Sequence, residues 1–177
     1  MEITQKQLQE ILDRHKRWLN NEEGGERAVL REFDLTGANL ATVSLINANL
    51  RRADLTGADL AGADLSGTNL TRANLSRATL SKANLTGADL SGADLTGADL
   101  TGASFITADL TEAELTAANL IGADLTGADL AGANLTRANL ISVDLKGSIL
   151  DRTTITLTPD SREALFNAWK NEFGASD

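Results

Sequence analysis

A five-residue rhythm of apolar and polar positions runs through most of the chain. Leucine or a close substitute recurs at every fifth residue from Leu30 to Ile155, which makes 26 consecutive units without an insertion. The central residue departs from leucine only at Phe105 and Ile155. A small residue, usually alanine, stands two positions earlier, and Asp or Asn lies between the two in most units. This period matches neither the 3.6 residues of a helix nor the 2.0 of a strand.

The order of residues within each unit predicts a coil with corners. Alanine and leucine lie two residues apart, so an extended backbone points both to one side and the Asp or Asn to the other. The last two positions, usually Thr or Ser and then Gly or Arg, must turn the chain, because the next residue is again an inward alanine. A corner every five residues predicts a polygonal coil that is lined by Ala and Leu and hydrogen-bonded to the coils above and below.

Runs such as Ala58-Asp-Leu-Ala-Gly-Ala-Asp-Leu-Ser-Gly67 resemble the pentapeptide-repeat family. The resemblance covers about three-quarters of the chain. It implies an all-β solenoid, a right-handed four-sided β-helix with one unit on each side. With four units per coil, the 26 units make about six and a half coils, and a spacing of ~4.8 Å gives a rod roughly 30 Å long. Because the motif describes packing, the resemblance is nearly silent on function.

Short helices are expected to close both ends of the solenoid, which divides the chain into three segments. Residues 1–27 form an N-terminal capping helix and linker, residues 28–157 form the repeats, and residues 158–177 form a C-terminal helix. Thr4 to Gln7 has the pattern of a capping box. The apolar residues expected to cover the end coils are Leu8, Leu12 and Trp18 at one end and Leu165, Phe166, Trp169 and Phe173 at the other.

Composition narrows the classes of function. The net charge of -9 and the pI of about 4.6 argue against direct nucleic-acid binding, which needs Lys and Arg to neutralise phosphates. No apolar run approaches the ~20 residues needed to span a bilayer, so no membrane association is expected. The first ten residues are polar and charged rather than an apolar secretory signal, and a cytoplasmic location is therefore expected.

The sequence predicts no catalytic, cofactor or metal site. His15 is the only histidine and has no partner at ligand spacing, so we interpret it as a helix-face residue that touches the first coil. The many Asp side chains point outward from a convex rod and are interpreted as a solvated surface. On this interpretation, replacing Asp89 by Ala costs little, whereas replacing the inward Leu90 by Asp unfolds the protein.

One outer face carries a charge pattern that makes it the candidate interaction surface. With four sides, three Asp residues fall on successive levels of this face and four Arg residues lie toward its N-terminal end. The acidic part resembles the DNA-mimicking surface of family members that protect DNA gyrase, and the basic part departs from it. Two isoleucines on the neighbouring face form a smaller apolar candidate. These residues are Arg31, Arg51, Arg52, Arg72, Asp89, Asp109, Asp129, Ile121 and Ile141.

These observations favour a non-enzymatic, rigid protein-protein interaction scaffold with a protein partner that the sequence does not identify. The alternative is a DNA-mimicking inhibitor or protector of DNA gyrase. Family members that mimic DNA dimerise through the C-terminal helix. Here that helix has one apolar stripe, which suffices to cap the rod, so a monomer is favoured over a dimer formed through this helix.

Overall fold

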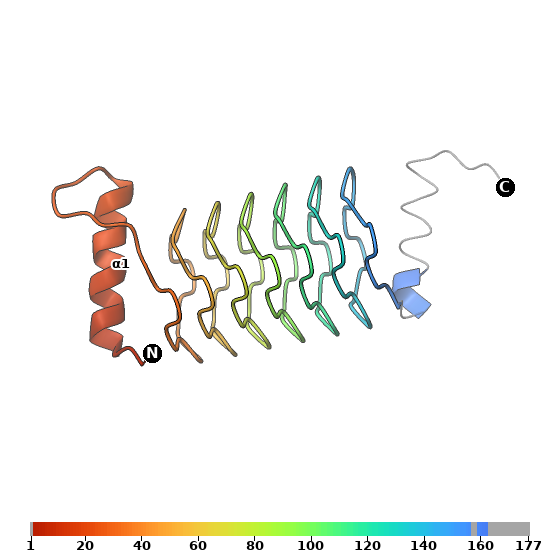
Figure 1. Cartoon of the computed structure of the whole chain (residues 1–177), viewed down its shortest axis with the longest axis horizontal. Helices are drawn as coiled ribbons and strands as arrows, with labels where there is room; N and C mark the ends of the chain where they lie inside the picture. Colours follow the sequence, from red (N-terminus) through yellow and green to blue (C-terminus); the bar gives the residue numbers. More distant parts are fainter. Residues whose placement is uncertain (1, 157–158, 163–177) are drawn as a thin grey trace.

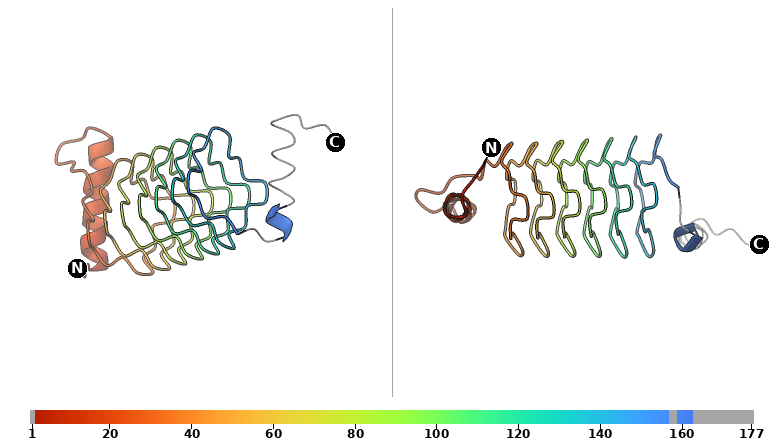
Figure 2. Two further views of the ribbon diagram at one scale, coloured as in Figure 1. Left: turned by 45° about the vertical axis from the view of Figure 1, so that its right-hand side comes forward. Right: turned by 90° about the horizontal axis from the view of Figure 1, so that it is seen from below.

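The computed structural model describes residues 2–156 and 159–162. One helix, α1 (Gln5–Leu19), lies across one end of a stack of coils, and residues 159–162 form a helical turn at the opposite end (Figure 1). Between them the chain winds as a solenoid, which two further views show obliquely and from below (Figure 2). The coil with corners predicted from the rhythm is therefore observed, and it has the β-helix form that the family resemblance implies.

Parallel bridges hold successive coils together. They join residues twenty positions apart, from the pair Val29 and Asn49 to the pair Asn134 and Thr154. An offset of twenty residues corresponds to four five-residue units per coil, one on each side. Each side contributes a single bridged residue rather than a longer strand. We call one side of one coil a level and name it by its central leucine.

A tight turn forms the corner after each central residue. At a typical corner, the Ala58 N–H donates to the Leu55 carbonyl at 2.9 Å, and the intervening Gly57 has a φ of 63°. A positive φ at the second central residue is the mark of a type II turn and favours glycine. Non-glycine residues accept the same conformation elsewhere, including Arg72 at 56° and the β-branched Thr42 at 59°. The hydrogen bonds between coils therefore hold these non-glycine residues in a left-handed conformation that their side chains disfavour.

The Asp or Asn of each unit hydrogen-bonds within its own corner. Asp54 Oδ1 accepts from the Thr56 N–H at 3.1 Å, and Asn74 Oδ1 accepts from the Ser76 N–H at 3.0 Å. This N–H is the one that the ladder leaves without a backbone acceptor, because the other four N–H groups of a unit pair with carbonyls. The Asp and Asn side chains are thus part of the turn, and their interpretation as a merely solvated surface is wrong.

The core consists of stacked leucine and alanine side chains. Central leucines such as Leu50 and Leu90 are fully buried, as is Phe105. Thr68 replaces the inward alanine of its unit and is also fully buried, and its hydroxyl donates to the Leu45 carbonyl at 2.7 Å. A polar residue is accepted at this position because its one donor finds a partner.

At the N-terminal end, α1 covers the first coil. The predicted capping box is present, since the Gln7 N–H donates to Thr4 Oγ1 at 3.2 Å and the Thr4 N–H donates to Gln7 Oε1 at 2.9 Å. Leu8 is buried in the core and Leu12 is half-buried against it. Gly25 packs on the helix, and a Cβ at this position would lie 2.6 Å from the Trp18 Cα atom.

At the C-terminal end, Ser161 replaces part of the missing next coil. Its side chain is fully buried, its Oγ accepts from the Leu140 N–H at 3.1 Å, and it donates to the Ala138 carbonyl at 3.4 Å. These bonds satisfy backbone groups that a further coil would have paired. The predicted cap residues Leu165, Phe166, Trp169 and Phe173 lie outside the described residues.

Substitutions at two neighbouring positions test the assignment of inside and outside. Leu90→Asp should unfold the protein, because it buries an unpaired carboxylate among stacked leucines. Asp89→Asn should cost little, since Asn69 makes the same turn one level away. Asp89→Ala should cost about 1–3 kcal/mol, because it leaves the Ser91 N–H without its acceptor. Urea unfolding measures all three, and equal losses for Leu90→Asp and Asp89→Asn would contradict the assignment.

Candidate interaction surface

The structure brings the predicted charged residues together on one side of the solenoid. Bridges join Asn49 to Asn69, Asn69 to Asp89, Asp89 to Asp109 and Asp109 to Asp129, so these side chains form one column. The backbone ladder places four arginines beside the column at its N-terminal end. We call this side the charged face; it comprises the column Asn49, Asn69, Asp89, Asp109 and Asp129 and the flanking Arg31, Arg51, Arg52 and Arg72.

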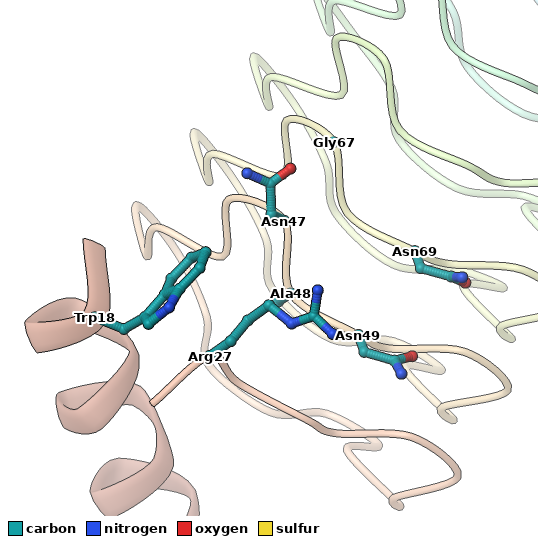
Figure 3. Close-up of a pocket in the computed structure, with 7 residues that line it drawn as sticks. All are labelled: Trp18, Arg27, Asn47, Ala48, Asn49, Gly67 and Asn69. Atoms are coloured by element: carbon teal, nitrogen blue, oxygen red, sulfur yellow. The ribbon is translucent and has the colours of Figure 1, made fainter. Parts of the chain in front are cut away.

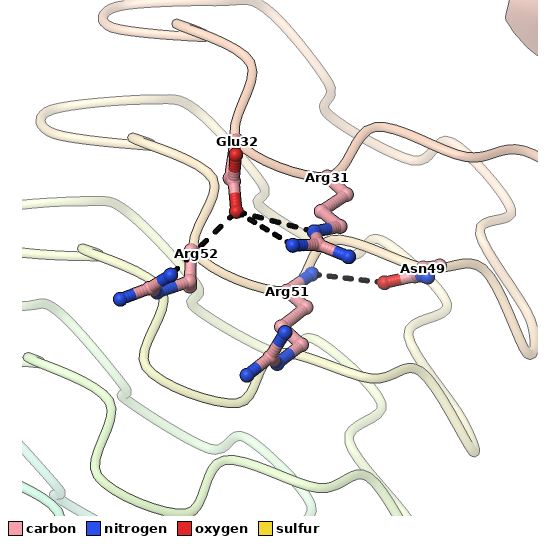
Figure 4. A network of polar contacts seen from close by, with 5 residues as sticks. All are labelled: Arg31, Glu32, Asn49, Arg51 and Arg52. Carbon is pink, nitrogen blue, oxygen red and sulfur yellow. Dashed lines mark hydrogen bonds and ion pairs between the residues drawn. The ribbon is translucent and has the colours of Figure 1, made fainter.

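The basic half of the charged face contains a small ion-pair network (Figure 4). Glu32 Oε1 lies 3.0 Å from Arg31 Nη2 and 3.7 Å from Arg52 Nη1. The hydrogen bond from Arg31 and the nearby guanidinium charges hold the pKa of Glu32 below its ordinary value. Arg51 and Arg72 form no ion pair within residues 2–156 and 159–162, so their charges are open to an outside acceptor.

The acidic half consists of carboxylates that accept hydrogen bonds within their own corners. Partial burial raises the pKa of Asp89, but hydrogen bonds from the Ser91 hydroxyl and N–H and from the Thr71 hydroxyl outweigh it and leave the pKa below its ordinary value. Asp109 Oδ1 accepts from the Thr111 N–H at 2.9 Å. The turn bond uses one oxygen of each carboxylate, and the second oxygen of Asp109 has no hydrogen bond among the described residues.

The apolar candidates are weaker than expected from the sequence. Ile121 and Ile141 lie on successive levels, since the Gly122 N–H donates to the Ile141 carbonyl at 2.9 Å, and both side chains are half-buried. In the part of the chain that the structure describes, the exposed large apolar residues are instead Val29, Ile149 and Leu150, at 52%, 50% and 40% exposure. Sequence reasoning missed the first two, although each replaces the usual Asp or Asn of its unit on the first and last level of the charged side.

A hollow of about 340 Å³ lies where α1 meets the charged face (Figure 3). Arg27 points over it, and Asn49 and Asn69 lie at its edge. Among the described residues, no acidic side chain lines it; the lining residues are Trp18, Arg27, Asn47, Ala48, Asn49, Gly67 and Asn69. Sequence reasoning missed this hollow, because α1 and the coil meet only in the folded chain. Its lining suits carboxylate or amide groups of a partner.

His15 holds α1 onto the first coil rather than acting in a site. It is fully buried, its Nδ1 accepts from the Ala28 N–H at 3.1 Å, and its ring stacks on Trp18 with centroids 5.4 Å apart. Burial and the Arg27 charge hold the pKa of His15 below its ordinary value of 6.5. A backbone contact with Ile46 favours the charged ring, but Nε2 has no well-formed hydrogen bond among the described residues, so burial dominates.

The described part of the chain contains no group of three or more His, Cys, Asp and Glu side chains arranged to hold a metal ion. Within the same residues, no helix has the length and apolar character needed to cross a bilayer.

Comparison with known families identifies the class of the protein. The family model described as pentapeptide repeats matches residues 26–60, 58–97, 88–127 and 118–156. The chain therefore belongs to the pentapeptide-repeat family, as the resemblance implied. No match is found among curated proteins.

Solved structures of pentapeptide-repeat proteins resemble the chain. HetL from Nostoc sp. strain PCC 7120, a protein involved in heterocyst differentiation regulation, is 37% identical, with 73% of each chain covered and a TM-score of 0.28. A protein from the Arabidopsis thaliana thylakoid lumen is 37% identical over 62% of this chain and 74% of its own, with a TM-score of 0.48. QnrB1, a plasmid-mediated fluoroquinolone resistance protein, is 20% identical over 86% and 88%, with a TM-score of 0.48.

The hydrogen bond of His15 generates a prediction about pH. The neutral His15 ring accepts the Ala28 N–H at Nδ1, whereas protonation of Nδ1 would place a ring N–H against the Ala28 N–H. Because the folded pKa lies below the unfolded value of 6.5, the stabilisation is complete above pH 6.5 and decreases as the pH falls below it. His15→Asn, which carries a side-chain acceptor but does not titrate, should lack this decrease. Urea unfolding between about pH 5 and 8 measures it; the same pH profile in both proteins would contradict the role of His15.

Proposed function

We propose that this protein is a non-enzymatic scaffold whose charged face binds a protein partner. The observation that carries the proposal is the segregation of charge. The repeats contain nine basic residues, and four of them flank the first three levels of the charged face. The next three levels of the column carry Asp89, Asp109 and Asp129. Of the other five basic residues, Arg77, Lys82, Arg137 and Lys146 lie on the other sides. Arg152 lies on the last level of the charged side, where it pairs with Asp151 at 3.8 Å.

The backbone supports such a role because it holds these groups in fixed positions. Neighbouring levels are spaced at the ~4.8 Å of hydrogen-bonded strands, and each column residue is bridged on both sides. Because these groups are already held in place, the scaffold loses little conformational freedom when it binds a partner that matches this spacing. The absence of enzymatic activity is part of the proposal: the one histidine is buried as a hydrogen-bond acceptor, and the Asp side chains serve the turns.

Mimicry of DNA toward DNA gyrase is the second candidate, and one observation favours it. Asp89, Asp109 and Asp129 form a ladder of carboxylates at regular spacing. The ladder covers only three levels, however, and Arg51 and Arg72 continue the same side with the opposite charge. A surface that imitates a phosphate backbone requires one sign of charge along its length. We therefore place the scaffold first.

Affinity capture with matched variants tests the scaffold. Arg52→Gln/Arg72→Gln removes two charges of the charged face, and Arg77→Gln/Arg137→Gln removes two charges elsewhere; all four residues have a positive φ at the last position of a unit. A specific partner should bind the wild type and the second variant equally and the first at least about tenfold more weakly. A partner that binds all three equally would place the interaction elsewhere and contradict the proposal.

A supercoiling assay with purified DNA gyrase separates the two candidates. Under the scaffold proposal, added protein changes neither supercoiling nor its inhibition by a fluoroquinolone. Protection or inhibition that disappears in Asp89→Asn/Asp109→Asn/Asp129→Asn would instead establish mimicry, because these changes remove the ladder of charge and keep a turn residue at each position.

A further inference from the structure

The charged face is complementary to itself when one copy is inverted. We propose that a second copy of this chain docks on it in antiparallel orientation, with the basic half of each subunit against the acidic half of the other. This inference rests on the proposed function, because it names the partner of the same face. It concerns a different surface from the C-terminal helix, for which the sequence favoured a monomer.

Symmetry selects the antiparallel arrangement. A two-fold axis parallel to the rod would place each level against the same level of the partner, and therefore arginine against arginine and aspartate against aspartate. A two-fold axis across the rod, in the plane of the interface, reverses the order of levels and keeps the position within each level. The charge of the face changes from basic, through the flanking arginines, to acidic between the levels of Leu70 and Leu90. An axis at this point brings opposite halves together throughout.

The turns orient the column for this contact. Asn49 and Asn69 use Oδ1 to accept from Arg51 and Thr71 N–H groups at 3.1 and 3.0 Å. Each keeps its amide N–H groups as donors without a partner among the described residues. Asp109 uses Oδ1 in the same turn and keeps its second oxygen as an acceptor. The same position of the unit thus presents donors in one half and acceptors in the other.

With the axis between the levels of Leu70 and Leu90, specific groups meet. Asn69 faces the partner's Asp89, and Asn49 faces the partner's Asp109. Arg52 faces the partner's Glu112, which occupies the matching last position of its unit. The hollow beside Arg27, with Asn49 and Asn69 at its edge, faces the partner's Asp109 and Asp89 in this register. Moving the axis by half a level would place Asp89 against the partner's Asp89, which like-charge repulsion disfavours.

The net charge of -9 opposes association at long range, so the contact is expected to be weak and to depend on the local pairs. At about 0.15 M salt the screening length is about 8 Å, which reduces the long-range repulsion more than the attraction between groups in contact. Self-association is therefore best measured near this ionic strength.

Sedimentation equilibrium tests the proposal with three proteins of known charge. The 18.6 kDa chain should form a dimer of twice this mass as its concentration rises toward about 100 μM. Asp89→Asn/Asp109→Asn/Asp129→Asn should raise the dissociation constant at least about tenfold. The control Asp94→Asn/Asp99→Asn/Asp124→Asn makes the same change in charge on other sides and keeps equivalent turn bonds, so it should dimerise like the wild type.

Three outcomes would overturn the antiparallel dimer. They are a monomer at every concentration, equal dissociation constants for both triple variants, and a dimer that persists unchanged in the charged-face variant, which would place the contact elsewhere. A monomer leaves the proposed function standing if affinity capture still finds a partner that requires Arg52 and Arg72. The two ideas therefore fail separately.

A charge exchange tests the register. Arg52→Glu and Glu112→Arg each place like charges across the interface and should weaken the dimer about tenfold, and the double variant should recover most of the loss. Both residues have a positive φ at the end of a unit, 58° and 57°, so the backbone treats them alike. Losses that simply add in the double variant would contradict the pairing of Arg52 with the partner's Glu112.

Discussion

The structure depends on finding acceptors for the backbone N–H groups of a coil whose sides are too short to be strands. Each unit has five N–H groups, and neighbouring coils or the turn carbonyl satisfy four of them. The fifth follows the central leucine and points away from the ladder. In units such as that of Asp54, the side chain two residues earlier accepts from it. An unpaired backbone group at every corner would be costly, so this side-chain bond makes the five-residue unit a workable building block.

Much of the fold could be predicted because the sequence repeats one five-residue pattern of inward and outward residues many times. The positions of Ala and Leu define the inside, and their repetition predicts a coil with corners without information on distant contacts, whereas the four-sided β-helix was implied by the family resemblance. The role of Asp and Asn was harder to predict, because a carboxylate that faces outward looks the same in a sequence whether or not it closes a turn. Asp89 shows the difference, since its hydrogen bonds became apparent only from the geometry of its corner.

The ends and the hollow could be predicted only in part. The capping box of α1 is local, and its sequence pattern was sufficient. The acceptor role of His15 depends on Ala28, and that of Ser161 depends on Leu140, twenty-one residues away. Such pairs come together only when the end coil and its cap meet. The charged face could be predicted in part. The five-residue period was sufficient to place its residues in columns, but the turn geometry was needed to see that Asn49 and Asn69 keep their amide N–H groups as donors.

The same constraint explains how the protein can carry a function on a repetitive backbone. Inward positions are fixed by packing, and the Asp or Asn position is restricted by the turn, but Asn and Asp satisfy the turn equally well. Choosing between them changes the charge of a column without changing its shape. Arginine or glycine at the last position of a unit offers a second choice at the same φ. Basic and acidic residues can therefore be placed at chosen surface positions of the solenoid with little loss of folding stability.

Native-state amide hydrogen exchange tests the central claim about the corners most directly. In the units of Asp54 and Asp109 the corner amides of Thr56 and Thr111 donate to the carboxylate. Where Thr79 and Glu114 replace the Asp or Asn, the corner amides of Ser81 and Thr116 have no acceptor among the described residues. The account predicts slow exchange at Thr56 and Thr111 and clearly faster exchange at Ser81 and Thr116. Equal protection at all four amides would contradict it.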